Sequence, residues 1–173
     1  MKQSQQISSK IFDREQLNRQ LKIWKLLDKK IVFTNGVFDI LHKGHLALLN
    51  QASSFADVLI VGVNSDASVK RLKGNSRPFN DEYSRTLLLA SLVMVDAVII
   101  FEEDTPIELI KNIMPHVLVK GGDYTIEKIV GAKEILDNNG EVKIVPVEKG
   151  FSTTLIVEKA KSTITDSGEN RNA

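Results

Sequence analysis

The chain has 173 residues, 42% hydrophobic and 26% charged, a balance typical of one globular domain with a buried core. Its 23 lysines and arginines face 22 acidic residues, and a net charge of +1 argues against a general nucleic-acid binder or a membrane-surface protein. The lack of cysteine excludes disulfides, thiolate zinc sites and cysteine nucleophiles. Because there is also no signal-peptide core and no apolar run of the roughly 20 residues that span a membrane, we expect a cytoplasmic protein.

The N-terminal segment, residues 1–29, is predicted to contain an amphipathic helix. Apolar residues recur at spacings of three and four from Leu17 to Trp24, and Asp13 with Gln16 fits a capping box. This helix could pack on its own domain or on a partner, so a homo-oligomer stays open.

Residues 30–161 are predicted to form an α/β domain, a Rossmann-like doubly wound sheet of about five parallel strands with helices on both faces. Short apolar, β-branched runs predict strands at 30–35, 58–63, 97–101, 117–119 and 142–145. The stretches between them predict helices at 45–55, 81–92, 106–114 and 129–138, with a last one at 152–161. Ligands of such sheets bind beyond the carboxyl ends of the strands. The small, polar tail 162–173 is expected to be disordered.

Two histidines follow the first predicted strand. His42 and His45 are three residues apart at a predicted helix start, so both can donate hydrogen bonds to an anion that the helix N-terminus already favours. Gly36 and Gly44 permit close approach of a nucleotide to the backbone. A zinc site would need a further ligand that the sequence does not provide, and a purely structural pair is the simpler alternative.

The stretch Thr34–His45 resembles the signature of the HxGH nucleotidyltransferase superfamily, whose members are cytidylyltransferase-like. Further matches resemble the adenylyltransferase domain of heptose 1-phosphate biosynthesis: 63–68, 71–74, 76–78, 101–106, 119–124 and 152–154. The resemblance covers about residues 30–161. It implies that ATP reacts with D-glycero-β-D-manno-heptose 1-phosphate to give ADP-heptose, a lipopolysaccharide precursor. Glu148 and Lys149 stand where the cytidylyltransferase branch usually has Arg-Thr, which disfavours CTP.

The resemblance and the residue chemistry together give three groups of site residues. We expect His42, His45 and Arg85 to be catalytic, with Arg85 pointing away from the core to clamp the triphosphate. The basic segment 70–77 is expected to be a mobile loop that places charges near substrate phosphates; the expected contacts there and nearby are Asp66, Lys73 and Arg77. The expected nucleotide-binding residues are Thr34, Asn35, Gly36, Phe38, Gly44, Lys120, Gly121, Asp123, Ser152, Thr153 and Thr154.

Each of these residues also has a simpler explanation. Arg85 and the basic segment could be solvated surface charges, the glycines after residue 119 an ordinary turn, and Ser152 a helix cap.

The expected reaction is in-line attack of the acceptor phosphate on the α-phosphorus of ATP, without a covalent intermediate. The histidines would stabilise developing charge and Mg²⁺ would share it, although no protein metal ligand is predicted. ATP and a sugar 1-phosphate are the expected partners, and a separate heptose kinase would supply the sugar phosphate. Two alternatives stay open, a cytidylyltransferase acting on glycerol 3-phosphate or another polyol phosphate, and a non-catalytic nucleotide-binding module.

Overall fold

A single parallel sheet of six strands forms the centre of the computed structural model, which describes residues 5–146 and 150–169. The strand order is β1-β4-β3-β2-β5-β6, and all the neighbouring strands pair in parallel. The strands are β1 (Ile11–Phe12), β2 (Ile31–Gly36), β3 (Val58–Asn64), β4 (Ala97–Phe101), β5 (Val117–Gly121) and β6 (Glu141–Val145). The Rossmann-like architecture and the five predicted strands are confirmed, and β1 is an additional strand.

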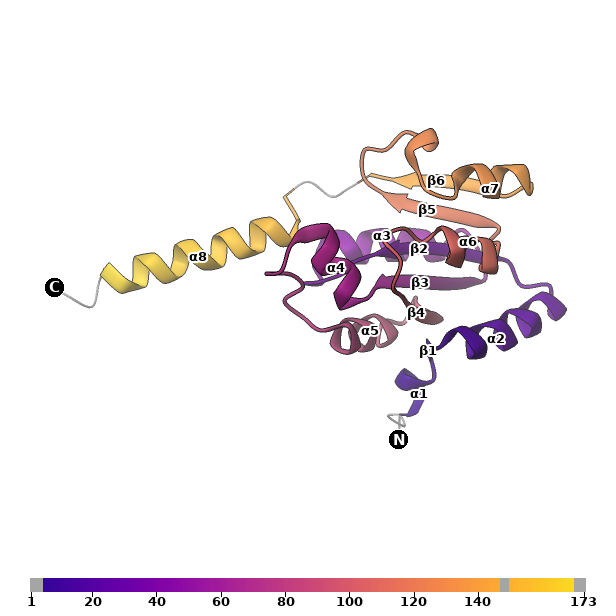
Figure 1. The fold of residues 1–173 in the computed structure, drawn as a ribbon, viewed down its shortest axis with the longest axis horizontal. Helices are drawn as coiled ribbons and strands as arrows, with labels where there is room; N and C mark the ends of the chain where they lie inside the picture. Colours follow the sequence, from indigo (N-terminus) through magenta and orange to yellow (C-terminus); the bar gives the residue numbers. More distant parts are fainter. Residues whose placement is uncertain (1–4, 147–149, 170–173) are drawn as a thin grey trace.

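Helices cover both faces of the sheet (Figure 1). The helices of the described residues are α1 (Gln5–Ser8), α2 (Arg14–Leu26), α3 (Lys43–Ser53), α4 (Asp66–Lys73), α5 (Glu82–Ala90), α6 (Ile107–Ile113), the 3-10 helix η1 (Ile126–Lys128), α7 (Ala132–Asp137) and α8 (Thr153–Glu169), and α8 projects away from the sheet. Buried side chains of α2, α6 and α7 pack on one face, and those of α3 and α5 on the other.

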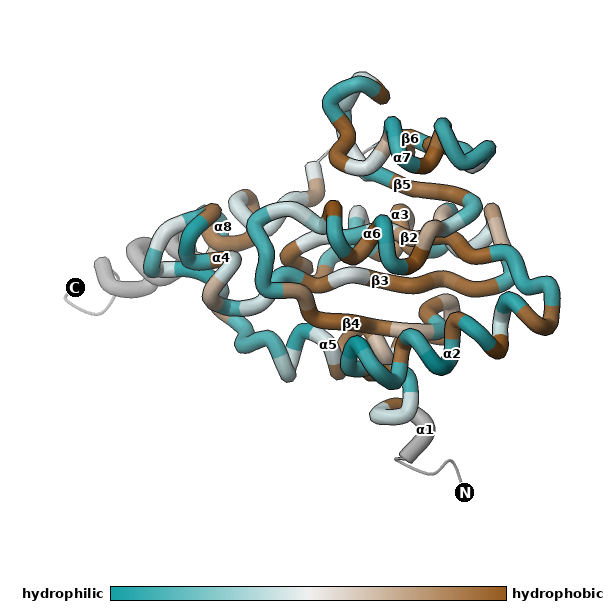
Figure 2. Tube along the Cα trace, turned by 45° about the vertical axis from the view of Figure 1, so that its right-hand side comes forward, coloured by the Kyte–Doolittle hydropathy of each residue, from teal (hydrophilic) through white to brown (hydrophobic). Residues whose placement is uncertain are grey.

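Alternation along the strands divides the core between these two faces. In β3, Val58 and Ile60 belong to the cluster under α2, α6 and α7, whereas Leu59 and Val61 belong to the cluster under α3 and α5. Every residue of β3 is buried, as expected for a strand covered on both faces. Figure 2 shows the same pattern, with hydrophobic strands between helices that are partly hydrophilic.

The N-terminal segment belongs to the same sheet and does not stand apart from it. The capping box of α2 is confirmed, because the Asp13 carboxylate accepts from Gln16 N at 2.7 Å and Gln16 Oε1 accepts from Asp13 N at 3.0 Å. Trp24 packs against the core and lies edge-on to the Phe12 ring, 6.3 Å between centroids. The helix therefore packs on its own domain through this side chain.

Two further segments differ from the sequence-based expectation. Helix α4 includes residues 70–73 of the basic stretch 70–77 expected as a mobile loop, whereas residues 74–77 lie outside helices and strands. The helix is capped by Ser65, whose Oγ accepts from Ser68 N at 3.1 Å. The expectation of a loop was wrong for residues 70–73, because Val69 provides a buried apolar anchor among the charges. Helix α8 continues through Ser162 to Glu169, in the segment expected to be disordered, and residues 170–173 lie outside the described residues.

The chain direction across the sheet reverses between β2 and β5. From β2 the chain adds β3 and β4 on one side, and later β5 and β6 on the other. The loops after β2 and β5 therefore diverge, and a crevice opens between them at the carboxyl edge, where ligands bind in open α/β sheets. Within the described residues, no helix is long and apolar enough to cross a membrane.

Candidate active site at the ends of β2 and β5

The loop after β2 leads directly into the first turn of α3. His42 is the N-cap residue of this helix, with extended backbone angles, and His45 lies in the first turn. The Nδ1 atom of His42 accepts from His45 N at 3.4 Å. A neutral ring that accepts through Nδ1 carries its proton on Nε2, so His42 keeps a donor for another group. The helix starts at Lys43, slightly before the predicted start.

The two histidine rings are stacked on one another. Their centroids are 3.8 Å apart with an interplanar angle of 19°, and Phe38 meets the His45 ring edge-on at 5.1 Å. Gly44 permits this arrangement, because a Cβ there would lie 3.1 Å from His42 Nδ1 and 3.5 Å from Phe151 Cβ. Gly36 likewise leaves room for the Phe38 ring, which a Cβ would meet at 3.1 Å. The packing of the His42 and Phe38 rings therefore explains why glycine occupies both positions.

Burial keeps both imidazoles neutral near pH 7. Desolvation lowers the pKa of His42 below its ordinary value. The pKa of His45 falls to about 4, first because of burial and then because of the nearby charges of His42 and Lys73, while a backbone hydrogen bond to Ile40 acts in the opposite direction. In the ligand-free protein, both rings are therefore neutral and can donate hydrogen bonds.

Lys120, near the end of β5, faces the histidines across the crevice. Its Nζ donates to Asn35 Oδ1 on β2 at 3.2 Å, and burial lowers its pKa. Within the part of the chain that the structure describes, no carboxylate forms an ion pair with this ammonium. Gly121 follows, and a Cβ there would lie 3.1 Å from the Leu48 side chain, so α3 and β5 approach closely at this point. A desolvated cation without a counter-ion is suited to bind an anion.

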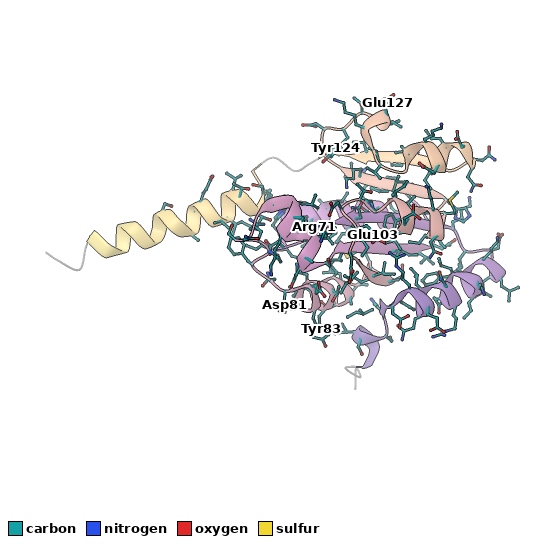
Figure 3. All side chains as sticks on the ribbon, viewed as in Figure 1. Arg71, Asp81, Tyr83, Glu103, Tyr124 and Glu127 are labelled. Atoms are coloured by element: carbon teal, nitrogen blue, oxygen red, sulfur yellow. The ribbon has the colours of Figure 1, made fainter. Side chains whose placement is uncertain are left out.

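A cavity of about 850 Å³ joins these groups. Most predicted site residues line it, namely Asn35, Gly36, Phe38, His42, Gly44, His45, Lys73, Arg77, Lys120, Gly121, Ser152, Thr153 and Thr154. The sequence analysis missed others that line it, including Val37, Leu48, Tyr124, Val145, Pro146 and Phe151. Tyr124 (labelled in Figure 3) stands two residues after the pair Gly121 and Gly122, and this position near the glycines could have suggested it.

Ser152 begins helix α8 at the mouth of this cavity. Its Oγ accepts from Leu155 N at 3.1 Å and its carbonyl accepts from Ile156 N at 3.1 Å, so the predicted capping role is present. Thr153 and Thr154 line the same cavity. The N-terminus of a helix adds backbone N–H groups without intrahelical partners to a cavity that is already lined by lysine and arginine side chains.

Four predicted residues lie outside the cavity. Thr34 is fully buried in β2, and Asp123 is exposed on the loop after β5. Asp66 is held by Arg85, whose Nη2 donates to Asp66 Oδ1 at 2.8 Å. These positions were predicted from motif proximity, but neighbouring side chains of a strand or turn point in different directions.

Arg85 has a different position from the one predicted. Its side chain is fully buried and does not point out toward the triphosphate. Its guanidinium donates to three backbone carbonyls, those of Val37 at 2.7 Å, Asn64 at 2.8 Å and Asn80 at 3.0 Å. With its donors directed at protein groups, Arg85 connects the ends of β2 and β3 with the segment before α5. The geometry gives it a positioning role in place of a direct phosphate contact.

Asp39 connects the same region from the loop after β2. Its buried carboxylate accepts from the backbone N–H of Phe79 at 2.7 Å and of Asn80 at 3.0 Å, and it pairs with Arg77 at 2.6 Å. Arg77 lines the cavity beside Lys73. The pKa of Lys73 is lowered, first by burial and then by the Arg77 charge, and the Asp39 carboxylate offsets part of this lowering. The two predicted cations are therefore fixed at the cavity wall by a helix and an ion pair.

The residues of the cavity do not fit a metal ion held by the protein. Its described lining contains no Asp or Glu, and no group of three or more metal-ligating side chains occurs among the described residues. A hard cation such as Mg²⁺ prefers carboxylate and carbonyl oxygens.

Known proteins resemble this chain over most of its length. Residues 33–164 match the model of the cytidylyltransferase-like family. The bifunctional protein HldE of Koribacter versatilis is 52% identical over 151 residues, and that of Campylobacter jejuni strain RM1221 is 51% identical over 158 residues. These matches cover 87% and 91% of this chain but only 31% and 33% of the relatives, so the chain spans about a third of their length.

Two solved structures share the fold. The lipopolysaccharide core biosynthesis protein of Thermoplasma volcanium is 31% identical with a TM-score of 0.56, and the match covers 71% of this chain and 99% of that one. Pantoate-beta-alanine ligase of Francisella tularensis, solved with beta-gamma ATP and beta-alanine, is 20% identical with a TM-score of 0.55, and the match covers 80% of this chain and 67% of that one. At this identity the likeness indicates a shared fold and nothing more. The family model matches residues 33–164, which include most of the sheet, the histidine pair and the start of α8. The chain therefore belongs to the cytidylyltransferase-like family of nucleotidyltransferases.

Proposed function

We propose that the chain transfers AMP from ATP to D-glycero-β-D-manno-heptose 1-phosphate, giving ADP-heptose and pyrophosphate. The observation that carries the proposal is the neutral, stacked pair of His42 and His45 at the start of α3, in one cavity with the ammonium of Lys120, which has no carboxylate partner among the described residues. This arrangement offers positive and hydrogen-bonding groups but no carboxylate base among its described residues. It suits a reaction in which all the reacting groups are phosphates.

The chemical step needs alignment and charge stabilisation more than proton transfer. An oxygen of the acceptor phosphate forms a bond to the α-phosphorus of ATP, and the bond from that phosphorus to the bridging oxygen breaks. Pyrophosphate carries away the electron pair. The nucleophile is already anionic at neutral pH, so the histidines need not remove a proton, and they can donate hydrogen bonds to oxygens on which charge builds up.

The cavity also provides separate places for the parts of ATP. Lys73, Arg77 and the start of α8 supply cations, hydroxyls and backbone donors for the β- and γ-phosphates. Leu48, Pro146 and Phe151 give an apolar wall on which a base can pack. Mg²⁺ bound to the phosphates would neutralise part of their charge.

The choice of acceptor rests on relatives and on the quoted motifs. The bifunctional HldE proteins and the lipopolysaccharide core biosynthesis protein are the similar proteins that point to this pathway. A separate heptose kinase would supply the sugar 1-phosphate, and a cytoplasmic location, consistent with the cysteine-free sequence, would give access to ATP.

A pyrophosphate-release assay with two triphosphates and two acceptors tests the proposal. We expect turnover with ATP and heptose 1-phosphate, and at least about tenfold less with CTP or with glycerol 3-phosphate. Turnover only with CTP and glycerol 3-phosphate would replace the proposal with a cytidylyltransferase. Nucleotide binding without pyrophosphate release under any combination would indicate a non-catalytic module.

A further inference from the structure

A second, smaller cavity of about 430 Å³ adjoins the histidine-lined one. The two cavities share six lining residues, which are Asn35, Gly36, Val37, Lys73, Lys120 and Tyr124. The shared wall therefore lies at the carboxyl ends of β2 and β5, with two lysines in it. A reaction between two phosphorylated substrates needs such a common boundary, because the attacking oxygen must come within about 3–3.5 Å of the phosphorus.

The two cavities differ in the chemistry of their remaining walls. The larger one combines cations and hydroxyls with apolar side chains, as a nucleoside triphosphate requires. Beyond the shared residues, the smaller one is lined by the apolar residues Leu72, Pro106, Leu118, Ile129 and Val130 and by the polar residues Asn64, Thr105, Lys128 and Asp104. Asp104 is the one carboxylate among the described lining residues of both cavities. A carboxylate repels a triphosphate but accepts hydrogen bonds from sugar hydroxyls. Asp104 is therefore the feature that makes the smaller cavity the better place for a polyhydroxylated acceptor.

Asp104 is held in place from helix α4. Arg71 Nε pairs with Asp104 Oδ1 at 2.7 Å, and Arg71 Nη2 donates to the carbonyl of Glu102 at 2.5 Å. The hydroxyl of Ser68 also donates to the carbonyl of Glu103 at 3.1 Å. Arg71 on α4 and Glu103 in the segment after β4 are both labelled in Figure 3. The Asp104 carboxylate, more than half exposed, keeps a free oxygen for a ligand.

We infer that the smaller cavity binds the sugar of the acceptor, with Asp104 accepting from its hydroxyls, and that Lys120 contacts both the acceptor phosphate and the α-phosphate of ATP at the shared wall. This inference rests on the proposed function and adds to it a location for the acceptor and a role for Lys120 between the two reacting phosphates. Two anionic phosphates repel each other at bonding distance, and a cation between them reduces that repulsion most when both are bound.

The surroundings of Lys120 fit this role better than a structural one. Its ammonium has Asn35 as its hydrogen-bond partner, and burial lowers its pKa. A group in this state costs the empty protein stability, and binding of anions compensates for the cost. A lysine that only supported the fold would be paired with a carboxylate or would extend its ammonium into water.

Replacing Asp104 tests the location of the acceptor. In Asp104→Asn we expect the KM for the sugar phosphate to rise about tenfold, with the KM for ATP changed less than about twofold. Glu102→Gln is the matched control, because it removes the same charge two residues away, outside both cavities. An unchanged acceptor KM in Asp104→Asn, or an increase confined to the KM for ATP, would overturn this part of the inference.

Replacing Lys120 tests the contact between the two phosphates. In Lys120→Met we expect kcat to fall about 100-fold, while the thermal midpoint of the ligand-free protein stays equal or rises. Lys143→Met on the neighbouring strand β6 is the control; it loses an exposed ion pair with Glu141 and should keep its kcat. A kcat within about threefold of the parent, or a clear loss of stability in Lys120→Met, would contradict the inference.

The parent chain separates failure of this inference from failure of the proposed function. If the parent releases no pyrophosphate with ATP and heptose 1-phosphate, the proposed function fails. If the parent is active but Asp104→Asn and Lys120→Met behave like their controls, only the inference fails. Direct titration of ATP by calorimetry should give the same Kd for Asp104→Asn as for the parent, and a weakened Kd would place ATP in the smaller cavity and overturn the inference.

Discussion

Two sets of polar residues lie at the carboxyl edge of the sheet, and they differ in how completely the protein satisfies them. Asp39, Asp66 and Arg85 do not line the cavity, and they are paired with Arg77, with one another or with backbone groups. In contrast, His42, His45 and Lys120 line the cavity, and burial lowers the pKa of each. Groups that the fold satisfies build the site, whereas groups that it leaves without an anionic partner are available for substrate. Substitutions in the two sets should therefore separate stability from catalysis.

The largest effect on catalysis is expected at His45. In His45→Asn the ring that stacks on His42 and lines the cavity is lost, so kcat should fall about 100- to 1000-fold, as when one donor to a developing oxyanion is removed. Steady-state kinetics measure the change. His116→Asn is the control, because His116 Nδ1 accepts from Ile31 N far from the cavity. A kcat of His45→Asn within a few-fold of the parent would mean that the pair is structural.

The largest effect on stability is expected at Arg85. Arg85→Met leaves three carbonyls and Asp66 without their donor, and the free energy of unfolding should fall by about 3 kcal/mol. Urea unfolding provides the measurement. The folded variant should keep the KM for ATP within about threefold, since Arg85 is not expected to touch phosphate.

A surface arginine provides the control for this variant. Arg19→Met removes an exposed pair with Glu15 and should change stability little. If Arg85→Met retained its stability and lost ATP affinity, Arg85 would be a phosphate ligand, as its family resemblance first suggested.

A smaller effect is expected at Gly44. The added methyl group of Gly44→Ala would press on His42 Nδ1 from 3.1 Å and on Phe151, displacing the ring or the start of α8. We expect kcat to fall about tenfold with a stability loss of about 1 kcal/mol. Kinetics and thermal unfolding of the same preparation measure both. Full activity in Gly44→Ala would show that the position of the His42 ring is not critical.

The smallest expected effect is a dependence of stability on pH. Because the folded-state pKa of His45 is about 4, below its ordinary 6.5, the unfolded chain binds more protons between these values. The free energy of unfolding should therefore decrease as the pH falls from about 6.5 to 4. In His45→Asn this part of the slope should be smaller in urea titrations at several pH values. Identical slopes would show that His45 is not held neutral by burial.

The same division between satisfied and unsatisfied groups explains what sequence could and could not predict. The strands and the histidine pair were predictable, because apolar periodicity and the strand-to-helix junction at Gly36 and Gly44 are local features. The two-residue strand β1 was not, since it exists only through pairing of Ile11 and Phe12 with Val98 and Ile99. Long-range pairing of so short a segment leaves no periodic signal.

The side-chain environment of single residues was the other part that sequence could not provide. Arg85 was placed outward because it lies among leucines on a helix, yet carbonyls from three separate segments converge on it. Likewise, Thr34 and Asn35 are neighbours in one motif, but only Asn35 lines the cavity. A motif identifies a segment, and the fold decides which side chains of that segment reach the ligand.

The most direct test of the account is to follow the α-phosphate of ATP through one turnover. With ATP labelled at its α-phosphorus, Mg²⁺ and heptose 1-phosphate, the account predicts that the label appears in a nucleotide sugar and that one unlabelled pyrophosphate forms for each labelled product. His45→Asn should form this product at no more than about one hundredth of the parent rate. Release of inorganic phosphate with labelled ADP, in place of pyrophosphate with a labelled nucleotide sugar, would contradict it.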